Sequence, residues 1–370
     1  MLIHAFGKKT AVVISCIAVL SLVGILAAPV AVFVTSGSSD AVSTAEPEKT
    51  AEPKKKFIKW VDFNVPYEAM DAALNADIKS HGEEIEYHWV ELLAYLATKY
   101  GGDWKLYKAS DLKKLTETIS AGKSMEELTN GMKNYSYFRE AYGAVLDGFV
   151  GEYEIEEPDK ENPEKTVMTK KYGLKVFSPI ARGYSFSHYD DFGSARSYGY
   201  KRKHLGHDLL GSVGTPVIAI ESGIAECVGW NQYGGWRIGI RSLDSKRYYY
   251  YAHLRKNHPY NDMYEGKIIK AGDVIGYLGM TGYSAKENVN NIDTPHLHYG
   301  MQLIFDESQK DGNGEIWIDV YAITQLLQKN KSTVYKDAEK KEYYRKYNFI
   351  DPAVTELIKG NQPIPSPTVP

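Results

Sequence analysis

The sequence predicts an α+β chain in which an N-terminal transmembrane helix and a small all-α domain precede an antiparallel β domain. Three observations lead to this prediction. Residues 11–34 are almost wholly apolar, residues 65–150 carry apolar side chains at helical spacing, and from Tyr172 onward short apolar runs alternate with glycine. Short strands with frequent turns are typical of antiparallel sheets. The 370 residues are enough for two folded units.

Residues 10–35 are expected to anchor the chain in a membrane. As a helix, the apolar run would span roughly 36 Å, which exceeds the hydrocarbon core of about 30 Å. Two lysines precede the run and the first charges after it are acidic, so the positive-inside rule predicts that the rest of the chain lies outside the cytoplasm. A cleaved signal peptide is the alternative, but the run is long for one and Pro29 disfavours cleavage after Ala28.

Overall composition excludes some classes of protein. A net charge of -3 and a pI near 6.4 give no sign of nucleic-acid binding. The two cysteines, Cys16 and Cys227, would lie on different sides of the predicted membrane boundary, so no disulfide within the chain is expected.

The helical domain is predicted over residues 65–150. One helix places its apolar side chains at i, i+3, i+4 and i+7 and ends at a Gly-Gly pair, and a later one begins with the capping box Ser124-Met125-Glu126-Glu127. The i, i+3, i+4 and i+7 positions are Trp89, Leu92, Leu93 and Leu96. This domain could position the β domain, block it until a signal arrives, or bind a protein partner, and the sequence does not separate these roles.

The remaining segments are poor in apolar side chains. Residues 36–62 are expected to be a solvated spacer, and residues 151–171, which carry charges and prolines, are expected to be a linker. The β domain is expected over residues 172–330. Residues 331–370 are expected to form a charged helix at 337–346 and a Pro-rich tail.

Five residues of the β domain form a candidate metal and catalytic site. They are His204, Asp208, His253, His296 and His298. Side chains alternate along a strand, so His204 and Asp208 would share one face, and His296 and His298 would share another. Two histidines and a carboxylate with one position left for water make a catalytic zinc site.

The chemistry of such a site needs more than the metal. Zinc lowers the pKa of bound water to about 7, but a base must take the proton and a donor must stabilise the oxyanion. No suitably placed glutamate is evident, so the two histidines that do not bind the metal must do both. His207 would face the core.

Six motifs that include these residues occur in a fixed order. They are His204-x-Gly-x-Asp208, Gly214-Thr215-Pro216-Val217, Tyr251-Ala252-His253-Leu254, Gly266 to Gly276, Gly279-x-Thr281-Gly282 and His296-Leu297-His298. Over roughly residues 173–305 the chain therefore resembles the lysostaphin-type (LytM-like) zinc endopeptidases. The resemblance implies a compact antiparallel β fold with a narrow groove, and cleavage of peptide bonds in the stems or cross-bridges of bacterial peptidoglycan.

The resemblance also implies roles for the five residues. His204, Asp208 and His298 would bind Zn²⁺, while His253 and His296 would be the catalytic pair, one acting as base and the other stabilising the oxyanion. Some relatives place a tyrosine a few residues before the first ligand to stabilise the oxyanion.

In this chain the nearest tyrosine to that position is Tyr198, with Tyr200 as its rival. The chain departs from the family pattern by an insertion at residues 283–295, which would form a loop near the groove and alter substrate preference.

Three functions are compatible with these residues. The first is an active endopeptidase held at the outer face of a bacterial cell membrane, or secreted if the apolar segment is cleaved. The second is a non-enzymatic relative that binds the wall or serves as a scaffold, although degenerate relatives usually lose a site residue. The third is a zinc carboxypeptidase, whose Glu-x-x-His pattern is absent around His296. The sequence does not identify the bond that is cleaved.

Overall fold

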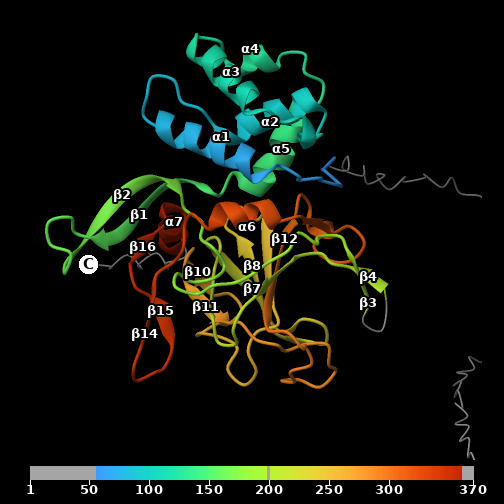
Figure 1. The fold of residues 1–370 in the computed structure, drawn as a ribbon, viewed down its shortest axis with the longest axis vertical. Helices are drawn as coiled ribbons and strands as arrows, with labels where there is room; N and C mark the ends of the chain where they lie inside the picture. Colours follow the sequence, from blue (N-terminus) through green and yellow to red (C-terminus); the bar gives the residue numbers. More distant parts are fainter. Residues whose placement is uncertain (1–55, 198–200, 361–370) are drawn as a thin grey trace, which may run out of the picture. The chain divides into compact units, whose positions relative to one another are not determined.

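The computed structural model describes residues 56–197 and 201–360 (Figure 1). The predicted anchor at residues 10–35 and most of the predicted spacer lie outside this range, as do Tyr198 and Tyr200. None of the helices in the described part of the chain combines the length and the apolar character needed to cross a bilayer.

The predicted helical region is confirmed. Five α-helices and one 3-10 turn lie between Tyr67 and Leu146: α1 (Tyr67–Ser80), α2 (Trp89–Tyr100), η1 (Trp104–Leu106), α3 (Ala109–Ser120), α4 (Met125–Thr129) and α5 (Tyr135–Leu146). The four apolar side chains predicted to form one stripe of α2 are all buried. Gly101 ends this helix in the left-handed conformation, at a φ of 62°, and the predicted capping box starts α4.

The predicted linker at residues 151–171 is wrong, because these residues lie almost wholly in a β-hairpin. Strands β1 (Val150–Pro158) and β2 (Thr166–Leu174) pair antiparallel, and β16 (Phe349–Ile350) adds to β1. Tyr153 and Ile155 alternate with glutamates and pack on a small hydrophobic cluster, where the rings of Tyr153 and Phe349 are 5.4 Å apart. In β1, Glu152, Glu154 and Glu156 occupy the alternate positions. The high content of charged residues concealed this two-residue alternation of apolar and charged side chains.

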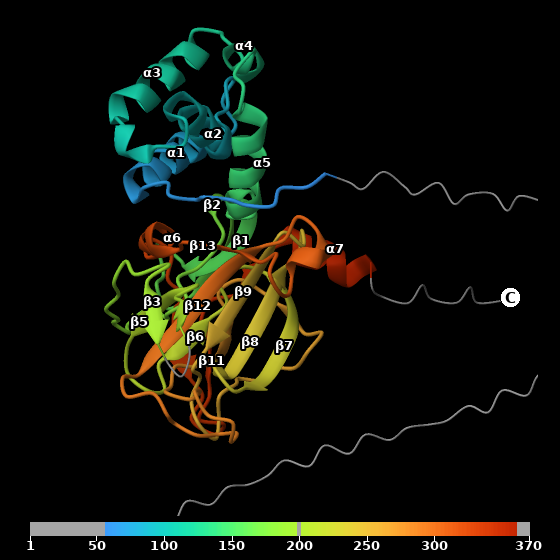
Figure 2. The same ribbon diagram turned by 90° about the vertical axis from the view of Figure 1, so that its right-hand side faces the viewer.

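The β domain is antiparallel, as predicted. Its main sheet runs β10-β7-β8-β9-β12-β13, and β5 also pairs with β12 (Figure 2). The strands are β5 (His207–Leu210), β7 (Gly223–Asn231), β8 (Gly235–Ser242), β9 (Arg247–Ala252), β10 (Ile268–Ile269), β12 (His296–Leu303) and β13 (Ile316–Ile318). Two further pairs are β6 (Pro216–Ile218) with β11 (Val274–Tyr277), and β3 (Ala195–Ser197) with β4 (Lys201–Lys203). Helix α6 (Tyr321–Leu327) follows β13.

The charged helix predicted at residues 337–346 is also wrong. The chain instead forms a hairpin of β14 (Val334–Lys336) and β15 (Tyr343–Arg345), followed by α7 (Pro352–Gly360). The carboxylate of Asp337 accepts hydrogen bonds from the backbone N–H groups of Glu339 and Lys340, at 2.9 and 2.7 Å. An aspartate that bonds its own following backbone favours a turn over a helix. The predicted Pro-rich tail, residues 361–370, lies outside the described range.

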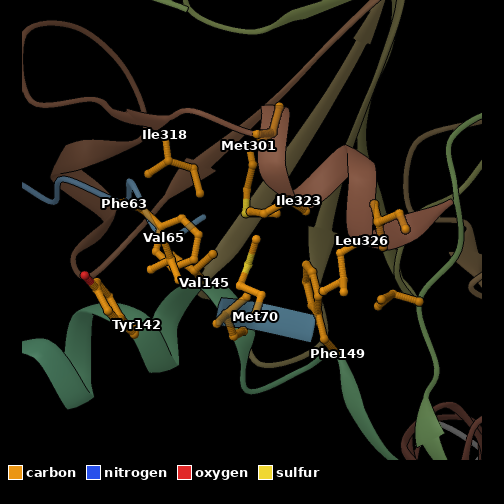
Figure 3. Packing of buried hydrophobic residues seen from close by; sticks show 14 of the residues in the cluster. Phe63, Val65, Met70, Tyr142, Val145, Phe149, Met301, Ile318, Ile323 and Leu326 are labelled. Carbon is orange, nitrogen blue, oxygen red and sulfur yellow. The ribbon is translucent and has the colours of Figure 1, made fainter. Parts of the chain in front are cut away.

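The helical region and the β domain share one hydrophobic core. Figure 3 shows Met70 and Phe149 of the helical region in one cluster with Met301, Ile323 and Leu326 of the β domain. All five are almost completely buried. Residues 55–370 accordingly form one compact unit instead of two independent ones.

A buried arginine joins the two regions. Arg247 is 1% exposed and donates two hydrogen bonds to the carboxylate of Glu221, at 2.8 and 3.0 Å. Its Nη1 also donates to the backbone oxygen of Ala144 in α5, at 2.7 Å, and the hydroxyl of Tyr249 donates to Glu221 at 2.6 Å. The ion pair is excluded from water, so the loss of any one partner would leave a buried charge or polar group unpaired. The cluster therefore links α5 to the start of β9.

Replacing Arg247 with methionine should lower the free energy of unfolding by about 3–5 kcal/mol, because Glu221 would remain buried without its partner. Urea denaturation of residues 55–370 measures this change. The matched control is Lys113→Ala, which removes an exposed pair with Glu117 at 3.7 Å and should change stability by about 0.5 kcal/mol or less. Similar losses in the two variants would contradict the role given to the buried cluster.

Candidate metal centre and active site

His204, Asp208 and His298 meet at one point. Nε2 of His204 lies 3.1 Å from Oδ1 of Asp208 and 3.1 Å from Nδ1 of His298, and Nδ1 of His298 lies 2.8 Å from the same carboxylate oxygen. Pairing of β5 with β12 sets Asp208 directly opposite His298. The three side chains are the described residues that could together hold a metal ion.

Strand alternation accounts for two of these three side chains. His207 and Leu297, the neighbours of Asp208 and His298, turn to the core and are 1% and 0% exposed. His204 differs from the prediction, because β5 begins only at His207. Its place is set instead by backbone hydrogen bonds with Gly193 and Ser194, at 2.8 and 2.9 Å.

Gly206 lets His204 approach Asp208 and His298. A Cβ atom at this position would lie 2.5 Å from Cε1 of His298 and 2.8 Å from the backbone oxygen of Tyr299. Any side chain here would therefore displace the ring of His298, so a glycine between His204 and Asp208 is required for the close approach of this segment to β12.

Asp191 and Arg196 contact the ring of His204 and were not found from the sequence. Oδ1 of Asp191 accepts a hydrogen bond from Nδ1 of His204 at 3.0 Å. Arg196 forms an ion pair with Asp191 and donates to Oδ2 of Asp208 at 3.1 Å. Asp191 precedes His204 by 13 residues, and no local motif connects them. A carboxylate behind a ligating histidine fixes the ring orientation and the tautomer.

The protonation of these groups suits metal binding. Burial alone would raise the pKa of Asp208, but the ring nitrogens of His204 and His298 outweigh burial and hold that pKa well below its usual value. Burial lowers the pKa of His298, which favours its neutral ring. An ionised carboxylate and neutral imidazoles are the forms that bind metal ions.

The donor set itself fits a divalent metal ion. The hydrogen on Nδ1 of His204 points at Asp191, so Nε2 presents a lone pair to a carboxylate oxygen 3.1 Å away. Two such lone pairs repel unless a proton or a metal cation lies between them. Ligand atoms around a tetrahedral ion with bonds of 2.0–2.2 Å are roughly 3.3 Å apart, close to the separations found here.

His253 is held beside this cluster in a strained backbone conformation. It follows the end of β9 at a φ of 60°, in the left-handed region that residues other than glycine rarely adopt. Its Nδ1 donates to the backbone oxygen of Thr281 at 2.8 Å, and its backbone N–H donates to Gly234 at 2.7 Å. Burial, and then the neighbouring ring of His296, lower the pKa of His253 well below its usual value.

Thr281 and Gly282 form the support for this histidine. The hydroxyl of Thr281 donates to the backbone oxygen of Leu254 at 2.6 Å, which fixes the carbonyl that Nδ1 of His253 contacts. A Cβ at Gly282 would lie 2.4 Å from the backbone oxygen of Tyr233 and 3.0 Å from Nδ1 of His253. The Gly-x-Thr-Gly motif is therefore part of the site as well as of the fold.

His296 completes the group of five. Its ring centroid lies 4.8 Å from that of His253, and its Nε2 lies 3.8 Å from Oδ1 of Asp208. Its Nδ1 donates to the backbone oxygen of Thr294 at 2.8 Å. Both histidines thus direct Nδ1 to a carbonyl, which leaves Nε2 of each neutral ring as a hydrogen-bond acceptor.

All five residues line one cavity of about 570 Å³. The β3–β4 hairpin and the loop before β12 supply much of the rest of its lining, with Glu315 and Trp317 at and before β13. The insertion at residues 283–295, expected near the groove, contributes five residues to the lining: Tyr283, Asn291, Ile292, Asp293 and Thr294. Tyr198 and Tyr200, the tyrosines predicted to stabilise the oxyanion, lie outside the described residues.

Comparison with known proteins agrees with this geometry. The profile described as Peptidase family M23 matches residues 202–311. The chain is 41% identical over 123 residues to an L-Ala–D-Glu endopeptidase of Bacillus subtilis, and 41% identical over 97 residues to lysostaphin of Staphylococcus staphylolyticus. These stretches cover 33% and 26% of this chain, but only 36% and 18% of the two relatives.

A solved structure from Ruminococcus gnavus, described as a candidate glycyl-glycine endopeptidase lytM, is 22% identical with a TM-score of 0.48, over 72% of this chain and 89% of that one. The family match at residues 202–311 includes His204, Asp208 and His298 and both neighbouring histidines. Residues 202–311 therefore form a domain of peptidase family M23, of the lysostaphin type.

Proposed function

We propose that this chain is a zinc metalloendopeptidase that hydrolyses peptide bonds in the stem peptides or cross-bridges of peptidoglycan. The observation that carries the proposal is the placement of His204, Asp208 and His298 at one point, with His253 and His296 in the same cavity. The names of the B. subtilis and staphylococcal relatives support the choice of a wall peptide as substrate.

Zinc is the proposed ion because two imidazoles and one carboxylate leave a tetrahedral site with one open position. When bound, Zn²⁺ supplies Lewis acidity toward a scissile carbonyl and toward water. His204, Asp208 and His298 would hold it. The carboxylate of Asp191 orients the first of these ligands, and the guanidinium of Arg196 keeps the carboxylate of Asp208 turned toward the two rings.

His253 and His296 would then share the proton transfers. The Thr281 carbonyl fixes the hydrogen of the His253 ring on Nδ1, so Nε2 is the nitrogen that can accept a proton from the attacking water. His296 is more exposed, and its Nε2, once protonated, is a donor that can stabilise the oxyanion. The hydrogen bonds from Nδ1 to backbone oxygens hold both rings in a fixed orientation before substrate binds.

Purified protein with added zinc should release new amino termini from peptidoglycan sacculi, and a chelator should abolish the release. His298→Ala and His253→Ala should each lower the rate by at least about 100-fold, because the first removes a ligand and the second the proposed base. His258→Ala, which changes a histidine that is 54% exposed and absent from the cavity lining, is the matched control and should keep the rate. Failure of the zinc-loaded protein to release any amino terminus would favour a non-enzymatic, wall-binding role.

Asp191→Asn should weaken zinc affinity by about 10- to 100-fold, because the amide can no longer hold the tautomer of His204 as the carboxylate does. Competition with a chromogenic chelator measures the affinity without any substrate. The exposed neighbour Asp190 provides the control, and Asp190→Asn should bind zinc as the unchanged chain does. Equal zinc affinities in the two variants would show that Asp191 does not orient His204 for metal binding.

We also propose that residues 10–35 anchor the protein in a bacterial cell membrane with the M23 domain outside the cytoplasm. The proposal rests on the apolar run and the charges that flank it. The full chain should stay with the membrane fraction after a carbonate wash, whereas a chain starting at residue 55 should not. Full recovery of a shortened chain in the medium would instead indicate a cleaved signal peptide.

A further inference from the structure

Arg202 is a cationic side chain of the cavity for which the described residues supply no anionic partner. It lies on β4, is half-buried, and lines the same cavity as the five site residues. Its guanidinium carbon lies 4.8 Å from the ring centroid of Tyr283, which comes from the inserted loop. Its Nε is buried and has no hydrogen-bond partner among the described residues.

Arg196 differs from Arg202 in having anionic partners. Arg196, on the neighbouring strand β3, uses its guanidinium in ion pairs with Asp191 and Asp208. Arg202 forms no ion pair with any of the described carboxylates, although Asp293 and Glu315 line the same cavity. Glu315 is engaged elsewhere, since it accepts hydrogen bonds from Nε1 of Trp317 at 2.7 Å and from the backbone of Gly312 at 3.2 Å.

We propose that Arg202, stacked on Tyr283 in the wall of the M23 cavity, binds a free carboxylate of the substrate next to the scissile bond. A guanidinium presents two parallel N–H donors that match a carboxylate, and a ring that already holds it reduces the side-chain entropy lost on binding. Lys203, the next residue and also part of the lining, adds positive charge to the same wall. This inference rests on the proposed endopeptidase function and specifies its substrate class.

The size of the cavity limits where that carboxylate lies. A sphere of about 570 Å³ is roughly 10 Å across, which equals about three residues of extended chain. A carboxylate bound by Arg202 therefore belongs to a residue within one or two positions of the bond at the histidine cluster. A γ-linked D-glutamyl residue with a free α-carboxylate has this chemistry, whereas a polyglycine bridge or an amidated D-isoglutaminyl residue lacks the charge.

Two matched peptides test the proposal. They share the sequence L-alanyl-γ-D-glutamyl-L-lysine, and differ only in whether the α-carboxyl group of the D-glutamyl residue is free or is a carboxamide. With the zinc-loaded full chain, we expect kcat/KM to be about 10- to 100-fold higher for the carboxylate peptide. Arg202→Gln should remove this preference by lowering kcat/KM for the carboxylate peptide alone, and Arg202→Lys should retain part of it.

Arg255→Gln is the matched control. This arginine is also stacked on a tyrosine, with its guanidinium carbon 4.2 Å from the ring centroid of Tyr277, but it does not line the cavity. The control should keep the preference for the carboxylate peptide. Equal losses on both peptides in Arg202→Gln, or no preference in the unchanged chain, would overturn the role of Arg202 while leaving the endopeptidase proposal intact.

A binding measurement separates the two proposals if neither peptide is cleaved. Absence of cleavage of the peptides and of sacculi would reject the proposed function. Calorimetric titration of the same two peptides into the zinc-loaded chain would still test Arg202. Tighter binding of the carboxylate peptide that is lost in Arg202→Gln supports the inference, and equal binding of both peptides overturns it.

Discussion

The pairing of β5 with β12 is the constraint on which the site depends. It sets Asp208 opposite His298, and β12 also pairs with β9 so that His298 lies opposite Ala252, the last residue before His253. One central strand thus fixes a carboxylate on one side and a histidine on the other. A shift of this register by a single residue would turn both His296 and His298 into the core, which is why the flanking positions on β12 must be apolar.

Much of the site could be predicted because its chemistry lies in short motifs. Residue type and strand alternation are local properties, so Asp208, His296 and His298 could be placed from the sequence. Asp191 could not, because it reaches His204 only when the chain before β3 folds back on itself. The hairpins at residues 151–171 and 337–346 were missed for another reason: their charged faces conceal the apolar alternation that packs Tyr153 and Tyr343 against the second cluster.

Loop geometry explains why several motif positions carry small residues. The left-handed backbone of His253 is sustained by Thr281 and by the close approach of Gly282, and the segment that carries His204 approaches β12 only because of Gly206. The sequence alone does not show how closely these glycines approach their neighbours. Their larger role follows from distances of 2.4–2.8 Å between a hypothetical Cβ and neighbouring atoms, which only the folded chain reveals.

The described residues of the helical region do not line this site. None of the residues that line the cavity precedes Arg196, so among the described residues the helices neither enter nor cover it. They are fixed instead to the sheet by the shared core and by the hydrogen bond from Arg247 to Ala144. Arg247 is the first residue of β9, and His253 directly follows the last. The strand that the helical region holds at one end is therefore the strand that presents a proposed catalytic histidine at the other, which favours positioning over blocking as the role of these helices.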